Sequence, residues 1–256
     1  MNKNLLKTSR IEELGKVWTP EANWRVPTAD EETVFVFPAF GPDVYNRVVK
    51  QVLANKQRLP TGEKNAFMLY EAYNSNIQEI KNSRRTEFVR KNIIHNGWLW
   101  VPNINVWTPR NIKNPGMYCI FDEEGEGLAK ERSVVELEDR LSGGSTERGV
   151  RFSRDRRVAF ALLNTITPKY HNKGALSQDG AFIANYEVEG AEKLDGVAKV
   201  FNFLPYSFII DNNSNEPIKT LSKLSRGSRD YKLIASFISG GDYRRGYVLP
   251  VSGFQS

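Results

Sequence analysis

Basic and aromatic side chains stand side by side in the segment from Lys81 to Trp107. Its second part, GWLWVPNINVW, contains three of the five tryptophans of the chain. Cationic side chains neutralise phosphates, and aromatic rings stack on unpaired bases. The residues of this segment that could bind a nucleic acid are Arg84, Arg85, Arg90, Lys91 and Trp98.

The tryptophans also have a structural interpretation. Large apolar residues occupy both faces of the stretch from Trp98 to Val101, as they do in a strand that is buried on both sides. On this interpretation the tryptophans anchor a core, and we favour it over base stacking. The basic residues before them then lie on the solvated side of a helix.

Four arginines surround a short turn further along the chain. Guanidinium groups on such a turn can bind phosphates, or enter a groove of a duplex as a two-stranded ribbon does. Together with the first basic group, they predict that the protein binds DNA or RNA through basic patches. The four residues are Arg151, Arg154, Arg156 and Arg157.

The charge of the chain changes sign in blocks, within a formal net charge of +6. Residues 78–118 and 140–173 are basic, whereas residues 121–139 carry eight acidic and two basic side chains. Complementary blocks of this kind also suit a protein-interaction or assembly module, including a homo-oligomer. A third alternative is an enzyme that acts on a phosphorylated or other anionic small molecule, with a site assembled from scattered residues.

The residues with nucleophilic, acid-base or metal-binding chemistry form no recognised motif. His95 and His171 stand apart from any nearby cysteine or acidic ligand, and Cys119 lies in the apolar run GMYCIF, where packing is its ordinary role. The carboxylates of residues 122–126 lack the spacing of an EF-hand, so a solvated turn is the simpler interpretation. We therefore predict no metal site and no cofactor, and we assign no catalytic residue.

Cysteine content and hydropathy bear on the compartment. The single cysteine excludes a disulfide framework within the chain and indicates a reducing environment. The first residues, MNKNLLKTSRIEELGK, lack the apolar core of a secretory signal, and no apolar stretch is long enough to cross a bilayer. We therefore expect a cytoplasmic protein that does not associate with membranes.

The side chains of the first third are expected to be held mainly by helices. Residues 32–40, ETVFVFPAF, are predicted to form one short strand that ends at a proline. Asp43 fits a helix N-cap, and valines from Val44 onward recur at helical spacing. Further helices are predicted at residues 63–73 and at about 77–94, the second with a basic exposed side.

After residue 97 the pattern indicates strands and turns. Residues 98–107 are predicted to form a hairpin with PNIN as its turn, and residues 149–162 a second hairpin. In the second hairpin Val150 and Phe152 are expected on the same side as Phe160. The remaining predictions are a strand at 117–121, a helix after a capping box at Ser133, a strand at 181–188, a helix at 191–200, a strand at 206–210 and a third hairpin at 231–252.

These elements predict an α+β fold. A helical N-terminal third would pack on a mixed, largely antiparallel sheet with short helices. The length and the 40% apolar content are sufficient for a large core. We expect a single composite domain over residues 1–256, and a subdivision into a helical part, residues 1–96, and a sheet-rich part, residues 97–256, is the alternative.

Replacing Arg154, Arg156 and Arg157 together should weaken nucleic-acid binding with little loss of folding, because residues of an exposed turn contribute little to a core. Fluorescence anisotropy with labelled single-stranded DNA, duplex DNA and RNA across a salt series measures the affinity and counts the phosphate contacts. An unchanged affinity in the triple variant would exclude this hairpin as the binding surface.

Overall fold

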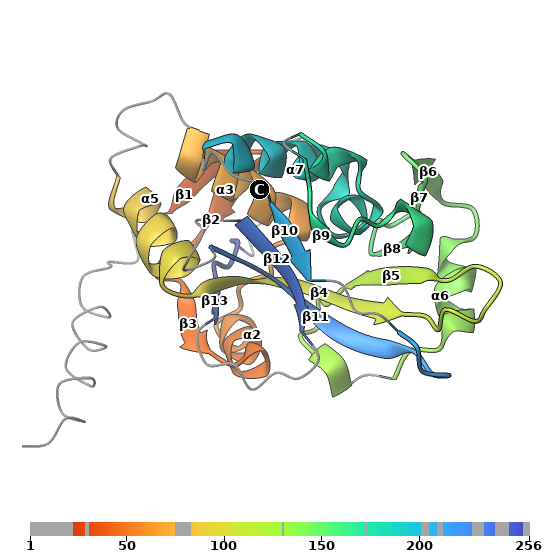
Figure 1. Cartoon of the computed structure of the whole chain (residues 1–256). Coiled ribbons are helices and arrows are strands. Elements are labelled where there is room, and N and C mark those ends of the chain that lie inside the picture. The colour runs from red at the N-terminus through yellow and green to blue at the C-terminus, as the bar shows by residue number, and fades with distance from the viewer. Residues whose placement is uncertain are drawn as a thin grey trace, which may run out of the picture.

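The chain has an α+β fold (Figure 1). The structure is a computed structural model that describes residues 23–28, 31–74, 83–129, 131–172, 174–200, 205–208, 212–226, 233–238 and 246–252. Within these ranges a large mixed sheet forms the centre, and helices cover both of its faces. None of the described helices is long and apolar enough to span a membrane.

The sheet is built outward from β4 (Trp98–Trp107). On one side follow β5 (Gly116–Phe121), β8 (Val158–Leu162), β7 (Val150–Phe152) and β6 (Ser145–Glu147). On the other side follow β11 (Ile218–Arg226), β12 (Leu233–Ile238), β10 (Tyr206–Phe208) and β9 (Lys169–Tyr170). A further strand, β13 (Gly246–Val248), joins β4 to β3 (Phe40–Asp43). Among the described pairings only β10–β12 and β13–β4 are parallel.

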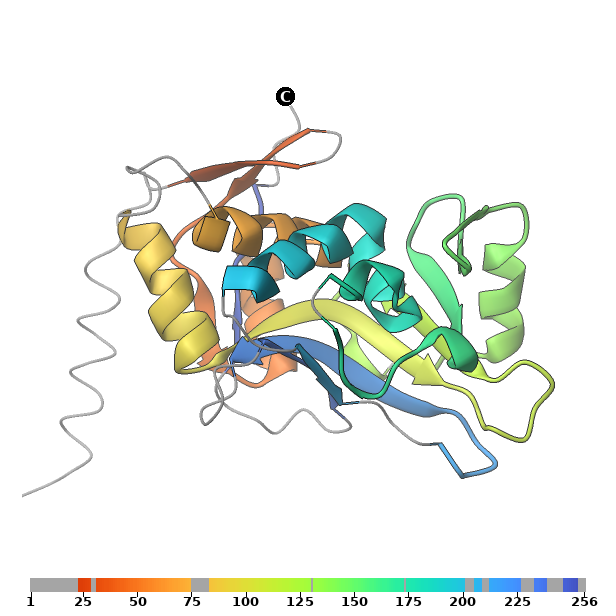
Figure 2. The ribbon, with the colours of Figure 1, turned by 45° about the horizontal axis from the view of Figure 1, so that its top comes forward.

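The helices lie on both sides of this sheet. They are α2 (Tyr45–Ala54), α3 (Gly62–Asn74), α5 (Arg84–Phe88), α6 (Val134–Leu141) and α7 (Gly180–Val200), with a π-helix η1 (Val89–His95) directly after α5. Short 3-10 turns are η2 (Gly127–Ala129), η3 (Leu163–Thr165) and η4 (Leu176–Gln178). In Figure 2, α3 and α7 lie together on one face of the sheet and α2 lies on the other.

Alternate residues of β4 belong to different cores. Leu99 and Trp107 pack into the core that also holds residues of α3 and α7. Trp100 and Ile104 pack with α2 on the opposite face. Because successive side chains of a strand point to opposite faces, a strand between two helical layers must be apolar on both. The structural interpretation of Trp100 and Trp107 is therefore confirmed.

The hairpin predicted for residues 98–107 is wrong, because β4 is one continuous strand. Its pairing with β11 changes register between Leu221, which lies opposite Ile104, and Ser222, which lies opposite Val101. The two extra residues on the β4 side, Pro102 and Asn103, form an irregularity of the kind that accommodates a proline within a sheet. The proline therefore marks a bulge here and no turn.

The helical N-terminal third is also wrong. β1 (Trp24–Pro27) and β2 (Glu32–Phe35) form an antiparallel two-stranded sheet, and β3 follows where the predicted strand was expected to have ended. Prolines in this region misled the prediction, because proline is tolerated in edge strands. The helix at α3 is confirmed, and α2 begins one residue later than expected, with Val44 as its N-cap.

The local start signal of α6 was predicted correctly. The capping box at Ser133 is present, with Glu136 as its partner. The helix predicted for 77–94 is described from Ser83 onward: the Ser83 hydroxyl accepts a hydrogen bond from the Thr86 amide, and α5 then continues as η1. Residues 77–82 lie outside the described residues.

The strand predicted at 181–188 is wrong, because these residues form the first part of α7. Nearly every side chain there is buried, and such a run does not distinguish a buried helix from a buried strand by periodicity. The decisive signal is Asp179, whose carboxylate accepts hydrogen bonds from the amides of Ala181 and Phe182 as a helix cap. The helix predicted at 191–200 is the second part of the same element.

The hairpin of β7 and β8 is confirmed, but its predicted faces are wrong. Val150 lies opposite Ala161, and Arg151 lies opposite Phe160, so Val150 and Phe160 point to opposite faces. The third predicted hairpin is wrong too, since β12 pairs with β11 and β10 whereas β13 pairs with β3 and β4. The residues between them, 239–245, lie outside the described residues.

A buried network of amides and a hydroxyl joins α7 to the central strands. The Asn185 side chain donates to the Asn105 Oδ1 at 3.0 Å and accepts from the Ser222 hydroxyl at 2.7 Å. Asn105 in turn donates to Ser222 at 2.6 Å, and Asn103 donates to the Asn185 backbone carbonyl at 2.8 Å. These four residues are at most 4% exposed, so each needs its partners inside the protein.

Replacing Asn185 with leucine should lower the free energy of unfolding by about 3 kcal/mol, because Asn105 and Ser222 would each lose a buried partner. Urea unfolding followed by circular dichroism measures the change. Asn111→Leu is the control, since Asn111 makes its hydrogen bond to Asn215 at the surface. Equal effects of the two substitutions would show that the network does not stabilise the fold.

Candidate ligand-binding site

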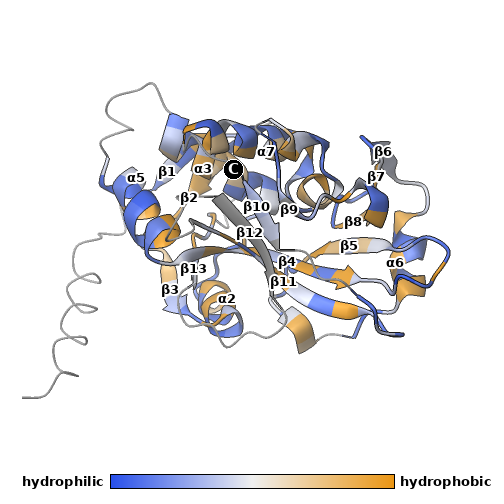
Figure 3. Cartoon of the chain, in the orientation of Figure 1, coloured by the Kyte–Doolittle hydropathy of each residue, from blue (hydrophilic) through white to orange (hydrophobic). Residues whose placement is uncertain are grey.

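The first group of predicted nucleic-acid-binding residues lies on α5 and η1. Arg84 is exposed and Arg85 is partly exposed, and α5 is coloured mainly as hydrophilic in Figure 3. Lys91 forms an ion pair with Glu87 at 2.6 Å. Arg90 lies 5.3 Å from the centre of the Tyr73 ring, and burial lowers its pKa. Of this group, Arg84 and Lys91 are exposed, and Lys91 is already paired with Glu87.

The second group lies around the turn between β7 and β8, and most of it is already paired with carboxylates. Arg151 donates to both carboxylate oxygens of Glu138, at 2.9 and 2.7 Å. Arg157 forms an ion pair with Glu123 at 2.6 Å. Arg154 is exposed and makes no ion pair with any residue in the described ranges. Phosphate binding at the paired arginines would compete with these carboxylates.

The two basic groups do not form one surface. In Figures 1 and 2, α5 lies at one end of the sheet, whereas β7 and β8 lie at the other. A nucleic acid that contacts both groups would therefore have to extend along the whole length of the sheet.

Trp98 lies partly exposed at the start of β4. Its ring meets the Trp100 ring edge to face, with centroids 5.7 Å apart. The Lys223 ammonium lies 4.0 Å from the centre of the Trp98 ring, a cation–π contact. A base could stack on that face of Trp98 only by displacing the lysine.

A cavity of about 200 Å³ opens beside the second basic group, and we call it the α7 pocket. Its wall is formed by the segment that leads into α3 and the start of that helix, the strands β4, β5, β7 and β8, the turn after β5, the turn between β7 and β8, and the middle of α7. Its lining residues are Arg58, Thr61, Gly62, Glu63, Asn103, Cys119, Phe121, Glu123, Phe152, Asp155, Arg156, Arg157, Ala159, Ala184, Asn185 and Glu187.

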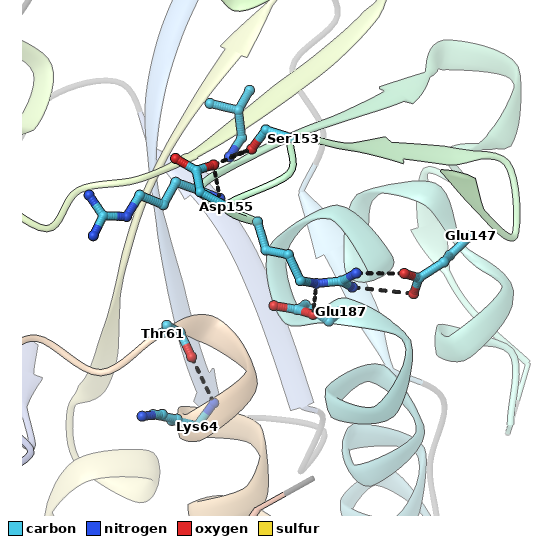
Figure 4. A network of polar contacts seen from close by, with 9 residues as sticks. Thr61, Lys64, Glu147, Ser153, Asp155 and Glu187 are labelled. Atoms are coloured by element: carbon cyan, nitrogen blue, oxygen red, sulfur yellow. Dashed lines mark hydrogen bonds and ion pairs between the residues drawn. The ribbon is translucent and has the colours of Figure 1, made fainter. Parts of the chain in front are cut away.

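Arg156 is the most constrained charged residue of the α7 pocket (Figure 4). Its two terminal nitrogens contact the two carboxylate oxygens of Glu147 on β6, and its Nε donates to Glu187 on α7. The guanidinium also lies 4.4 Å from the centre of the Phe152 ring. The hydrogen bond with Glu147 raises the pKa of Arg156, and the same bond lowers the pKa of Glu147.

Two residues of this contact have unfavourable backbone conformations. Arg156 has φ of 55°, and Glu187 has φ of 59° with ψ of 176° inside a helix. A side chain at such angles costs on the order of 1–3 kcal/mol, and glycine alone adopts the second conformation readily. The conformation of Glu187 kinks α7 at the pocket. Strain of this size is typical of functional sites, where it positions a side chain.

The inner wall of the α7 pocket is formed by buried groups. Gly62 approaches α7 so closely that an added Cβ would lie 1.8 Å from the Asn185 carbonyl oxygen, so glycine is required there. Cys119 is buried, and burial raises the pKa of its thiol. The cysteine therefore stays protonated at neutral pH, which agrees with the packing role expected from the sequence.

A smaller depression of about 110 Å³ adjoins the α7 pocket and shares Phe121, Glu123 and Arg157 with it. Its other lining residues, Glu124, Arg132 and Arg140, are charged as well. The ion pair between Arg157 and Glu123 stands at the boundary between the two spaces. A ligand longer than the α7 pocket could extend past this pair.

The acidic segment after β5 is held by internal hydrogen bonds. Asp122 is 1% exposed, and its carboxylate accepts from the Tyr45 hydroxyl and from the amides of Glu126 and Gly127. Within the described ranges, no three His, Cys, Asp or Glu side chains are grouped closely enough to hold a metal ion. The buried aspartate thus shapes the turn, and sequence analysis had placed it in solvent.

His171 belongs to a buried polar cluster. Its Nε2 lies 2.8 Å from the Ser207 hydroxyl, and its Nδ1 lies 3.9 Å from Asp179, too far for a hydrogen bond. The three residues are at most 2% exposed, and Asp179 already caps α7. Burial lowers the pKa of His171. We interpret this arrangement as structural, because a substrate would have no access to the serine.

Comparisons with known proteins add little to this geometry. No model of a known protein family matches the sequence. A search of curated proteins gives no significant match. One solved structure, described as "Accommodation of massive sequence variation in Nanoarchaeota by the C-type lectin fold", has 10% sequence identity and a TM-score of 0.44, over 91% of this chain and 96% of its own. A likeness at this level of identity assigns no ligand or activity to the chain.

Sequence analysis identified Arg156 and Arg157 but missed their partners. Glu123, Glu147 and Glu187 are distant from one another in the sequence, and no spacing rule connects them. The one local signal was a carboxylate in the middle of an otherwise buried run, at Glu187. A charged residue in such a run needs a partner, and the arginine-rich turn could have been proposed to supply it.

Replacing Lys223 with methionine should stabilise the protein by about 1 kcal/mol at pH 7, because the wild-type protein partly buries a charged ammonium. Burial lowers the pKa of Lys223 to about 8. An unfolded lysine has a pKa of about 10.4, so between these values the unfolded state binds more protons and wild-type stability rises with pH.

The advantage of the Lys223→Met variant should therefore shrink between about pH 8 and pH 10. Urea unfolding of both proteins at several pH values measures it, and Trp98 fluorescence should titrate near pH 8 in the wild type alone. A stability difference that does not change with pH would contradict the lowered pKa.

Proposed function

We propose that this protein binds a small molecule through an anionic group in the α7 pocket. The proposal rests on the hydrogen bonds of Arg156. Glu147 binds the two terminal nitrogens of its guanidinium, and Glu187, which lines the pocket, binds its Nε. An arginine held in this way can bind a carboxylate or phosphate with little further loss of side-chain freedom.

The backbone around the pocket supports a binding role. Strain at Arg156 and at Glu187 lowers the stability of the fold, and the conformation of Glu187 is one that glycine alone adopts readily, so a carboxylate there favours a role for that side chain. The close approach of α3 at Gly62 fixes the facing wall. We propose binding rather than catalysis because burial keeps the Cys119 thiol protonated and the arginines and carboxylates named above are paired with one another.

Nucleic-acid binding and a role in protein assembly stay predictions. Arg84 and Arg154 are the residues of the predicted set that favour the first of them, since both are exposed and neither forms an ion pair with another described residue. A cytoplasmic location is also a proposal, and it is based on the single cysteine of the chain.

Replacing Arg156 with glutamine should weaken binding of a small acid by about tenfold or more, because a charged hydrogen-bond donor is removed from the pocket. Isothermal titration with inorganic phosphate, succinate and L-glutamate measures the affinity. Arg148→Gln is the matched control: Arg148 also pairs with a glutamate and is equally exposed, but it does not line the pocket. Equal affinities in the wild type and the Arg156 variant would refute the proposal.

Replacing Glu187 with glycine should raise the free energy of unfolding by about 1 kcal/mol, because relief of backbone strain outweighs the loss of a partly exposed ion pair. Glu187→Ala removes the same carboxylate but keeps the Cβ, so it should be less stable than the wild type. Urea unfolding of the three proteins gives the order, and a glycine variant no more stable than the alanine variant would show that Glu187 is not strained.

A further inference from the structure

We infer that the ligand of the α7 pocket is a zwitterion of about amino-acid size, which exchanges ion pairs with Arg156 and Glu187. This inference rests on the function proposed above and specifies the class of ligand. It follows from three properties of the pocket, namely the balance of its charges, its volume and the geometry of the contact between Arg156 and Glu187.

The charges that line the pocket are of both signs. Its basic residues are Arg58, Arg156 and Arg157, and its acidic residues are Glu63, Glu123, Asp155 and Glu187. A ligand with negative charge alone would bring its anion close to several carboxylates, and a purely cationic ligand would meet the arginines. Like charges brought together in a partly desolvated site are costly. A ligand that carries both charges avoids this cost.

The geometry at Arg156 allows such an exchange. Glu147 binds both terminal nitrogens of the guanidinium and lies outside the pocket, whereas Glu187 binds Nε and lines the pocket. An anionic group that enters can therefore replace Glu187 at Nε while Glu147 holds the arginine in place. The carboxylate of Glu187 then gives up its hydrogen bond from Nε, and a cationic group on the same ligand can take the place of the guanidinium.

The exchange leaves no charge without a partner. Opening this partly exposed ion pair has a modest cost, because each charge is less well solvated in the pocket than in water. A ligand with a carboxylate and an ammonium group forms two ion pairs for the one that opens. Arg157 and Glu123 form a second pair in the same pocket, at 2.6 Å, which can respond to a ligand in the same way.

The volume sets the size of the ligand. A cavity of about 200 Å³ holds roughly seven water molecules, and it is smaller than the pockets that bind drug-sized compounds. An amino acid fits this space. Phe121, Phe152 and Ala159 supply apolar surface for a side chain, and the Asn103 amide lies among them in the lining of the pocket.

The test compares ligands that differ only in charge. The twenty free L-amino acids are first screened by thermal shift, and each one that binds is compared by isothermal titration with its N-acetyl derivative, which is an anion, and its amide, which is a cation. We expect at least one free amino acid to bind and both derivatives to bind at least about tenfold more weakly.

Variants of the two charged residues separate the contributions. Glu187→Gln should weaken binding of the free amino acid by about tenfold but leave binding of the N-acetyl derivative unchanged or stronger, because the competing carboxylate is gone. Arg156→Gln should weaken both. Glu192→Gln is the control, since Glu192 pairs with Arg148 outside the pocket.

The outcomes distinguish this inference from the proposed function. If an N-acetyl derivative binds as tightly as the free amino acid, or if phosphate or succinate binds through Arg156 while no amino acid does, the ligand is a plain anion. The zwitterion is then refuted and the proposed function stands. If none of these compounds binds, both are refuted.

Discussion

The position of α7 depends on one constraint, the hydrogen bonding of buried amides at its contact with β4 and β11. Apolar side chains tolerate small shifts of one element along another, because their attraction has no direction. Asn185 does not tolerate such a shift, since a buried amide without hydrogen-bond partners costs about 1–3 kcal/mol. Its bonds to Asn105 and Ser222 therefore select one register for the helix. Glu187 follows two residues later, so the same constraint brings its carboxylate to Arg156.

Elements with local signals could be predicted from the sequence. The capping box at Ser133 places donor and acceptor within one helical turn, so four consecutive residues contain all the information for the start of α6. The turn between β7 and β8 is similarly local, because Ser153 and Asp155 bind the amides that follow them. The α+β class followed from elements of this kind, and for the same reason the Arg156 side of the site could be found.

Elements that depend on distant partners could not be predicted. The first part of α7 is apolar almost all round, so its periodicity does not distinguish a helix from a strand, and apart from the cap at Asp179 only its contacts with two layers identify it as a helix. β12 and β13 are neighbours in sequence but pair with different strands, and no local pattern specifies that choice. The pocket has the same origin: Glu147 and Glu187 meet Arg156 through the sheet topology, which a single sequence does not reveal.

The kink at Glu187 also divides the macrodipole of α7 into two parts. In an unbroken helix the aligned peptide dipoles leave partial charges only at the two ends. A residue with φ of 59° and ψ of 176° interrupts this alignment, so the part of α7 that follows has its own macrodipole, with its positive end beside the pocket. A negative charge there is attracted by the helix as well as by Arg156. The middle of a long helix, which is electrically neutral in most proteins, has here become a place where an acidic group is stabilised.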